Sequence, residues 1–84
     1  MKYTVVWRPT ALQRLADLYN NAADRQSVTS AANHIDKLLG RDPLAQGESR
    51  GGPTRILLIE PLGVYYDVSE DDRLVTVWAV WRRG

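Results

Sequence analysis

Residues 54–81 read TRILLIEPLGVYYDVSEDDRLVTVWAVW, and this stretch decides the fold. It contains three runs rich in β-branched and aromatic side chains, a composition that is typical of strands. The runs span residues 54–60, 64–69 and 74–81. Because the connecting segments PLG and EDDR are short, the three strands are predicted to form an antiparallel meander.

The residues before the meander predict one further strand and a first helix. Residues 2–7, KYTVVW, have the composition of a strand. Pro9 suits the first turn of a helix, where its missing amide hydrogen would have no partner. Apolar residues then recur three and four positions apart, which predicts an amphipathic helix over residues 9–23.

A second amphipathic helix is predicted to follow, with Asp24 or Ser27 capping its start. Gly40 is expected to end it in the left-handed conformation. Residues 41–53 hold three glycines and two prolines and are predicted to form a loop.

Residues 1–84 are therefore predicted to form a single α+β domain, since a chain of this length leaves no room for a second. A two-helix hairpin is expected to pack on one face of a small, mainly antiparallel four-stranded sheet. The element order is β-α-α-β-β-β.

Composition narrows the class of protein. The absence of cysteine excludes a disulfide framework and a thiolate metal site. The apolar run before Arg8 is too short for a signal peptide or a membrane span, so we expect a cytoplasmic protein without membrane contacts. With a net charge of +1, any role in nucleic-acid binding must depend on a few placed arginines.

The last predicted strand is apolar on both faces. Because side chains alternate along a strand, Leu74, Trp78 and Val80 are predicted to share one face. Two helices can cover only one face of the sheet, and large exposed apolar patches are typical of interaction sites. We therefore predict that a partner polypeptide binds over these three residues. Scattered exposed apolar side chains without a partner are the alternative.

Three segments carry the pattern of a known family: RPTALQRL (8–15), LLGRDPLAQG (38–47), and RILLIEPLGVYYDV (55–68) followed by LVTVWAVWRR (74–83). Their order and spacing resemble the RelE/ParE toxin superfamily of type II toxin–antitoxin systems, which includes plasmid stabilisation proteins. The resemblance spans nearly the whole chain. It implies the β-α-α-β-β-β fold already predicted from periodicity.

The resemblance also implies partners and activities. RelE-type members cut messenger RNA in the ribosomal A site, whereas ParE-type members poison DNA gyrase. Both are neutralised by an antitoxin whose C-terminal segment wraps around the toxin. We expect a cognate antitoxin and, first, a RelE-like endoribonuclease (mRNA interferase) with a reduced basic site. A ParE-like gyrase inhibitor and an inactive antitoxin-binding member are the alternatives, and the chain's own homo-oligomeric state stays open.

Cleavage of RNA requires a base, an acid and cations that stabilise the phosphate. The resemblance places Arg55 and Arg83, with Arg82 beside the latter, at basic positions of the RelE-type site. Arg50 is a candidate RNA contact or else a solvated loop residue, and Arg82 and Arg83 alternatively serve solubility.

The chain departs from the RelE-type pattern at several positions. Leu57 and Gly63 occupy two further basic positions, and the C-terminal tyrosine of that site has no counterpart. Tyr65 or Tyr66 is a substitute proton donor, although strand aromatics more often serve packing. His34 is expected to be a half-exposed flanking residue of the second helix. With one histidine and scattered carboxylates, no metal site or cofactor is expected.

Overall fold

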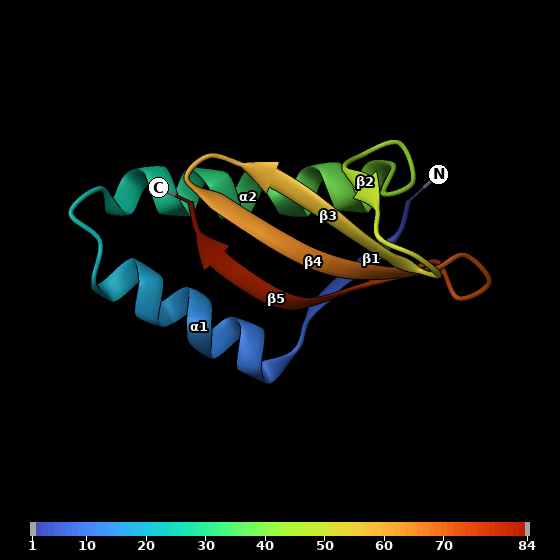
Figure 1. Ribbon diagram of the computed structural model, residues 1–84, viewed down its shortest axis with the longest axis horizontal. Helices are drawn as coiled ribbons and strands as arrows, with labels where there is room; N and C mark the ends of the chain where they lie inside the picture. The colour runs from blue at the N-terminus through green and yellow to red at the C-terminus, as the bar shows by residue number, and fades with distance from the viewer. Residues whose placement is uncertain (1, 84) are drawn as a thin grey trace.

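The computed structural model describes residues 2–83, which form two helices and five strands (Figure 1). In chain order the elements are β1 (Thr4–Trp7), α1 (Pro9–Asn20), α2 (Arg25–Arg41), β2 (Glu48–Ser49), β3 (Thr54–Ile59), β4 (Leu62–Ser69) and β5 (Leu74–Arg82). The predicted α+β class and the meander are confirmed. The sheet has one strand more than predicted, because β2 forms inside the segment that was expected to be a loop.

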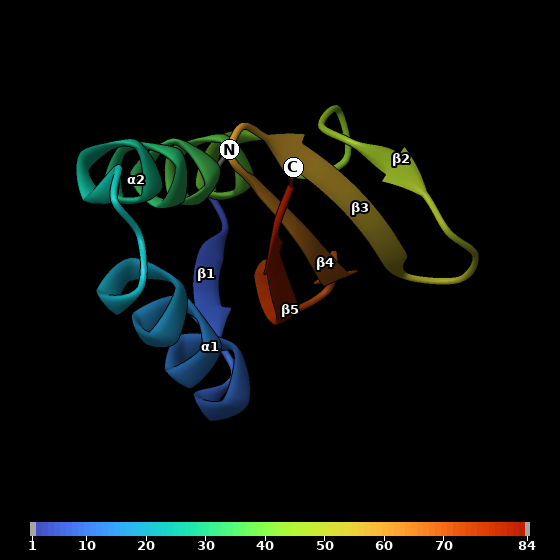
Figure 2. The same ribbon diagram turned by 60° about the vertical axis from the view of Figure 1, so that its left-hand side comes forward.

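The strands form one sheet in the order β1-β5-β4-β3-β2. β1 runs parallel to β5, and the other neighbours are antiparallel. Both helices lie on the same side of the strands, as Figure 2 shows. Neither helix in the described part of the chain has the length and the apolar run needed to cross a membrane.

The core lies between α2 and the sheet. The buried residues of α2 recur at helical spacing: Val28, Ala31, Ile35 and Leu39. They pack against buried side chains of β3, β4 and β5: Leu57, Leu62, Val64, Tyr66, Val75, Val77 and Val80. Burying one large aliphatic side chain stabilises a fold by about 1.5–3 kcal/mol, so this single layer carries most of the hydrophobic stabilisation. By contrast, α1 contributes only Ala11 as a fully buried residue.

The helix boundaries differ from the predicted ones at two points. α1 ends at Asn20, three residues before the predicted end. Gly40 does not end α2 in the left-handed conformation, because the helix continues to Arg41 and Gly40 has no positive φ. Instead, the carbonyl of Gly40 accepts a hydrogen bond from the Tyr3 amide at 2.8 Å, which joins α2 to the chain entering β1.

The predicted alternation of β5 is wrong beyond Val77. Tyr66 pairs with Val77 but Tyr65 pairs with Ala79, so Trp78 is the extra residue of a β-bulge. The bulge turns Val80 to the helix side, where it is only 5% exposed. Val80 is therefore a core residue and does not share a face with Trp78.

The sheet face turned away from the helices is called here the open face, and all five strands contribute to it. The strand register groups on it Thr4, Val6, Glu48, Thr54, Ile56, Leu58, Gly63, Tyr65, Asp67, Ser69, Leu74, Thr76, Ala79 and Trp81, and the stack on Tyr65 adds Trp78. Leu74 and Trp78 lie on this face as predicted.

The Tyr66 hydroxyl fixes the loop between α2 and β2 to the sheet. It lies 2.9 Å from the carbonyl oxygen of Pro43 and 2.8 Å from that of Gln46. Burial raises the pKa of the Tyr66 hydroxyl, and the neighbouring Arg55 opposes this shift in part. The loop then turns at Gly47 (φ +62°), which aligns β2 with β3.

Substituting Tyr66 by phenylalanine removes the donor that holds the loop. We expect Tyr66→Phe to lower the free energy of unfolding by about 1–3 kcal/mol, because a buried carbonyl loses its partner. Urea unfolding monitored by circular dichroism measures the loss. Tyr65→Phe, on the open face, is the matched control and should change stability by less than about 0.5 kcal/mol. Equal losses in the two variants would contradict the anchoring role.

Gly47 should tolerate no side chain. A Cβ at this position would lie 2.0 Å from the carbonyl oxygen of Ile56, whereas a Cβ at Gly52, with a similar φ of +55°, would meet no atom within 4 Å. We expect Gly52→Ala to cost about 1–2 kcal/mol from the left-handed backbone alone. Gly47→Ala should cost clearly more in the same unfolding experiment. Equal costs would show that the close approach to β3 is not limiting.

Candidate functional site

The two arginines at the end of β5 are both bound to carboxylates of this chain. The Nη2 atom of Arg82 lies 2.9 Å from Oδ2 of Asp24, just before α2. The hydrogen bond from Arg82 lowers the pKa of Asp24, and the same bond raises the pKa of Arg82. Arg83 binds the Glu60 carboxylate through its guanidinium. The chain's own acids therefore already bind both cations.

Arg55 occupies a different part of the sheet. It pairs with Tyr66 across β3 and β4 and shares its face, opposite to the open face. Its Nε and Nη2 atoms donate to the carbonyl oxygens of Gln46 (3.2 Å) and Gly47 (3.4 Å). Arg55 thus binds the same loop that the Tyr66 hydroxyl holds.

The structure does not bring the predicted catalytic arginines together. Arg55 lies opposite Tyr66, and Arg82 lies opposite Leu62, four residues earlier on β4. At about 3.3 Å per residue, these positions are separated by roughly 13 Å along the strand. Arg50 is exposed and donates to Glu48 at 3.1 Å, next to the turn that leads into β3.

The fold leaves no space for a long side chain at two positions where the RelE-type pattern has basic residues. Leu57 is only 6% exposed and belongs to the core. Gly63 lies under the ring of Trp81, which an added Cβ would approach to 2.6 Å. A cation at either position would require the surrounding side chains to move.

The groups that could transfer a proton are also dispersed. His34 is exposed on α2 and lines a surface pocket together with Glu60, the carboxylate that binds Arg83. Tyr66 is buried and its hydroxyl contacts the loop, while Tyr65 lies in an aromatic stack. Among residues 2–83, no three His, Cys, Asp or Glu side chains lie close enough to hold a metal ion.

The open face carries an aromatic cluster. The Tyr65 ring is stacked on that of Trp78, with centroids 5.1 Å apart and an interplanar angle of 9°. Trp81 contacts Tyr65 from another direction, at 5.0 Å and 45°. Trp78 remains 36% exposed, Val6 41% and Leu58 44%. Apolar surface therefore extends across this face, and partner binding by Leu74 and Trp78 stays a prediction.

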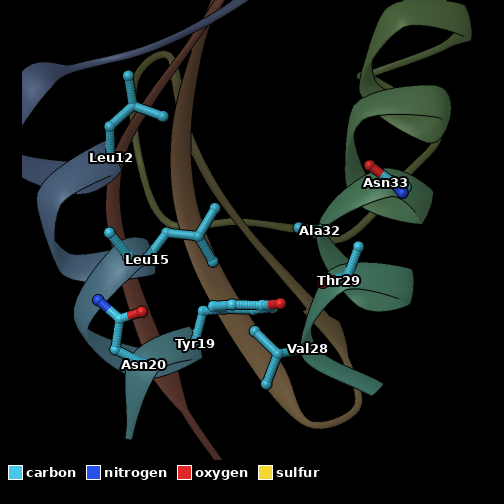
Figure 3. A pocket seen from close by; sticks show the side chains of 9 residues that line it. Leu12, Leu15, Tyr19, Asn20, Val28, Thr29, Ala32 and Asn33 are labelled. Carbon is cyan, nitrogen blue, oxygen red and sulfur yellow. The ribbon is translucent and has the colours of Figure 1, made fainter. Parts of the chain in front are cut away.

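A second apolar surface lies between the two helices (Figure 3). It is a groove of about 400 Å³ lined by Leu12, Leu15, Ala16, Tyr19, Asn20, Val28, Thr29, Ala32 and Asn33. In Figure 3, Leu15 and Tyr19 of α1 extend toward α2. Leu12 and Tyr19 are 51% and 42% exposed, although both belong to the apolar residues that recur three and four positions apart in residues 9–23. That apolar spacing was the one sequence signal for this groove.

The family model described as ParE toxin of type II toxin-antitoxin system, parDE, matches residues 5–84. No curated protein sequence matches the chain.

Solved structures of toxins and their complexes share the fold. A chain of the RelBE2 toxin–antitoxin complex from Mycobacterium tuberculosis has a TM-score of 0.82 at 20% identity, covering 99% of this chain and 93% of that one. For the chromosomal ParDE system from P. aeruginosa the TM-score is 0.72 at 15% identity, with coverages of 99% and 98%. The isolated E. coli RelE toxin has a TM-score of 0.69 at 14% identity, covering 98% of this chain and 85% of that one.

These structural similarities establish the fold, and the sequence match extends from the middle of β1 to the C-terminal residue. Because the family model covers all but the first four residues, the chain belongs to the ParE toxin family of type II toxin–antitoxin systems.

Proposed function

We propose that this toxin acts by binding its target, DNA gyrase, and does not cut RNA. One observation carries the proposal: the arginines expected to form a cleavage site are separated, and each is bound to a group of its own chain. The gyrase target follows from the resemblance to ParE-type toxins.

The chemistry of RNA cleavage supports this choice. A general base and a general acid must lie within hydrogen-bond reach of the reacting oxygens. Arginine stabilises phosphate charge, but its guanidinium stays protonated at physiological pH, so it cannot serve as the base. His34 and Tyr66, the alternative proton carriers, lie on a helix surface and in the core. A toxin that only binds its target needs none of these groups.

A cognate antitoxin is the proposed natural inhibitor. Several of the similar structures are toxin–antitoxin complexes, among them RelBE2 from M. tuberculosis and RelBE from E. coli. The helix groove and the open face offer this chain two apolar surfaces that its own residues leave exposed. Exposed apolar patches of this kind favour binding of another polypeptide.

RelE-like cleavage of messenger RNA remains the second candidate, because the ion pairs at the end of β5 are exposed. The paired side chains of Arg82 and Asp24 are 36% and 40% exposed, and those of Arg83 and Glu60 are 39% and 68% exposed. Surface pairs of this kind are worth about 0–1 kcal/mol, so an RNA phosphate could displace the carboxylates.

Induction of the toxin alone in bacteria separates the two activities. We expect filamentation and altered DNA supercoiling before incorporation of labelled amino acids falls, because gyrase is the proposed target. Plasmid topology on chloroquine gels and pulse labelling provide the measurements. Early translation arrest with A-site cuts, relieved by Arg55→Ala and Arg83→Ala, would instead establish RNA cleavage. Normal growth would contradict both activities and leave only antitoxin binding.

The helix groove should contribute to antitoxin binding. We expect the double variant Leu12→Glu/Tyr19→Glu to reduce affinity for the antitoxin at least about tenfold, because it places charges in an apolar contact. Both residues are exposed, so the fold should persist. The antitoxin is taken as the product of the reading frame next to the toxin gene, and calorimetry measures the affinity. Gln13→Glu, also exposed on α1, is the control; an equal reduction there would remove the groove from the interface.

A further inference from the structure

We infer that Asp67, together with the aromatic rings of Tyr65 and Trp78, forms a site for one arginine side chain of the antitoxin. The inference rests on the proposed antitoxin partner and adds the chemistry by which the open face recognises it. The occupant is an antitoxin segment that presents an arginine among apolar side chains.

The hydrogen bonds of Asp67 do not require its charge. Its Oδ1 atom accepts from the Thr54 hydroxyl at 2.7 Å and from the Trp78 indole Nε1 at 3.1 Å. Both donors are neutral and both reach the same oxygen, so the amide oxygen of an asparagine could accept from both. The fold therefore supplies hydrogen-bond donors to this half-buried carboxylate but no cation to match its negative charge.

No cation of the described chain neutralises Asp67. The ion pairs among residues 2–83 join Arg50 to Glu48, Arg82 to Asp24 and Arg83 to Glu60, and none includes Asp67. Arg73, the nearest arginine along the chain, lies over the Tyr3 ring at 5.4 Å. The turn at this end of β4 adds Glu70, Asp71 and Asp72. This end of the open face is therefore complementary to a positive charge.

The surroundings of Asp67 favour a guanidinium over other cations. Among the described residues, Asp67 belongs to no group of three His, Cys, Asp or Glu side chains that could hold a metal ion. The indole that donates to Asp67 belongs to the Tyr65–Trp78 stack and is itself 36% exposed. A planar guanidinium can bind a carboxylate and lie against an aromatic ring at the same time, which an ammonium does less well.

The remainder of the open face indicates a polypeptide as the carrier of this cation. Val6, Leu58 and Trp78 are each more than a third exposed, and they lie on three different strands. A small amine would leave this apolar surface uncovered. An RNA strand would bring its phosphates close to the acidic turn, where like charges repel. An antitoxin segment can supply both the apolar contact and the charge.

The test uses the complex of the full toxin with the product of the neighbouring reading frame. We expect Asp67→Asn to weaken binding by at least about tenfold, because the antitoxin arginine loses its counter-charge. The substitution is isosteric and keeps an acceptor for Thr54 and Trp78. Asp71→Asn, in the adjacent turn, removes the same charge from the same end of the sheet and should change affinity less than about threefold. Urea midpoints verify that both variants fold.

A charge exchange identifies the partner residue. In the toxin variant Asp67→Lys, binding should be lost, and substitution of one antitoxin arginine by glutamate should restore it. Trp78→Leu retains the carboxylate but removes the ring, and it should weaken binding less than Asp67→Asn does.

Several outcomes would overturn the site. If Asp67→Asn and Asp71→Asn bind the antitoxin equally well, the carboxylate has no specific partner. If a single-stranded RNA oligonucleotide quenches tryptophan fluorescence in the wild type but not in Trp78→Leu, and displaces the antitoxin, the aromatic surface binds bases instead. If the wild-type toxin fails to bind the antitoxin at all, the proposed antitoxin partner fails together with this site, whereas loss of binding in Asp71→Asn as large as in Asp67→Asn would overturn the site alone.

Discussion

The β-bulge at Trp78 determines which side chains of β5 enter the core and which lie on the open face. Before the bulge, Val75 and Val77 lie on the helix side of the sheet. After it, the next core residue is Val80, one position later than the residue 79 that simple alternation would place there. The added residue lets β5 supply three valines to the core and still place Trp78 and Trp81 on the open face. Without it, Val80 would point to solvent and the aromatic cluster would lose one of its tryptophans.

The charged side chains of the sheet also differ in what they bind. Arg55 and the Tyr66 hydroxyl bind the loop that leads into β2, whereas Arg82 and Arg83 tie the end of β5 to neighbouring segments. Each arginine therefore has a place in the fold. Asp67 differs from them, because its hydrogen bonds are satisfied without any use of its charge. The charges of these arginines are thus used within the fold, whereas the charge of Asp67 is available to a partner.

Much of the fold was predictable because its signals are local. The spacing of Val28, Ile35 and Leu39 indicates α2, and the short turns between apolar runs indicate the meander. The β-bulge, β2 and the face of Arg55 were not predictable, since they depend on strand register. Register is set by pairs such as Tyr65 with Ala79, which a single strand does not reveal. The helix groove was not predictable either, because the apolar pattern of a single helix does not show how closely two helices approach.

The contact between Gly63 and Trp81 also links two positions in the evolution of this family. A ring that lies this close to a backbone position must move before any larger residue fits there. A homologue that carries a lysine or arginine at position 63 is therefore expected to have a smaller residue at position 81. Aromatic cover and a basic side chain are alternatives at this point of the sheet, so a change from one to the other requires two coordinated substitutions. Aligned sequences should consequently divide into two groups at this pair of positions, with few members in between.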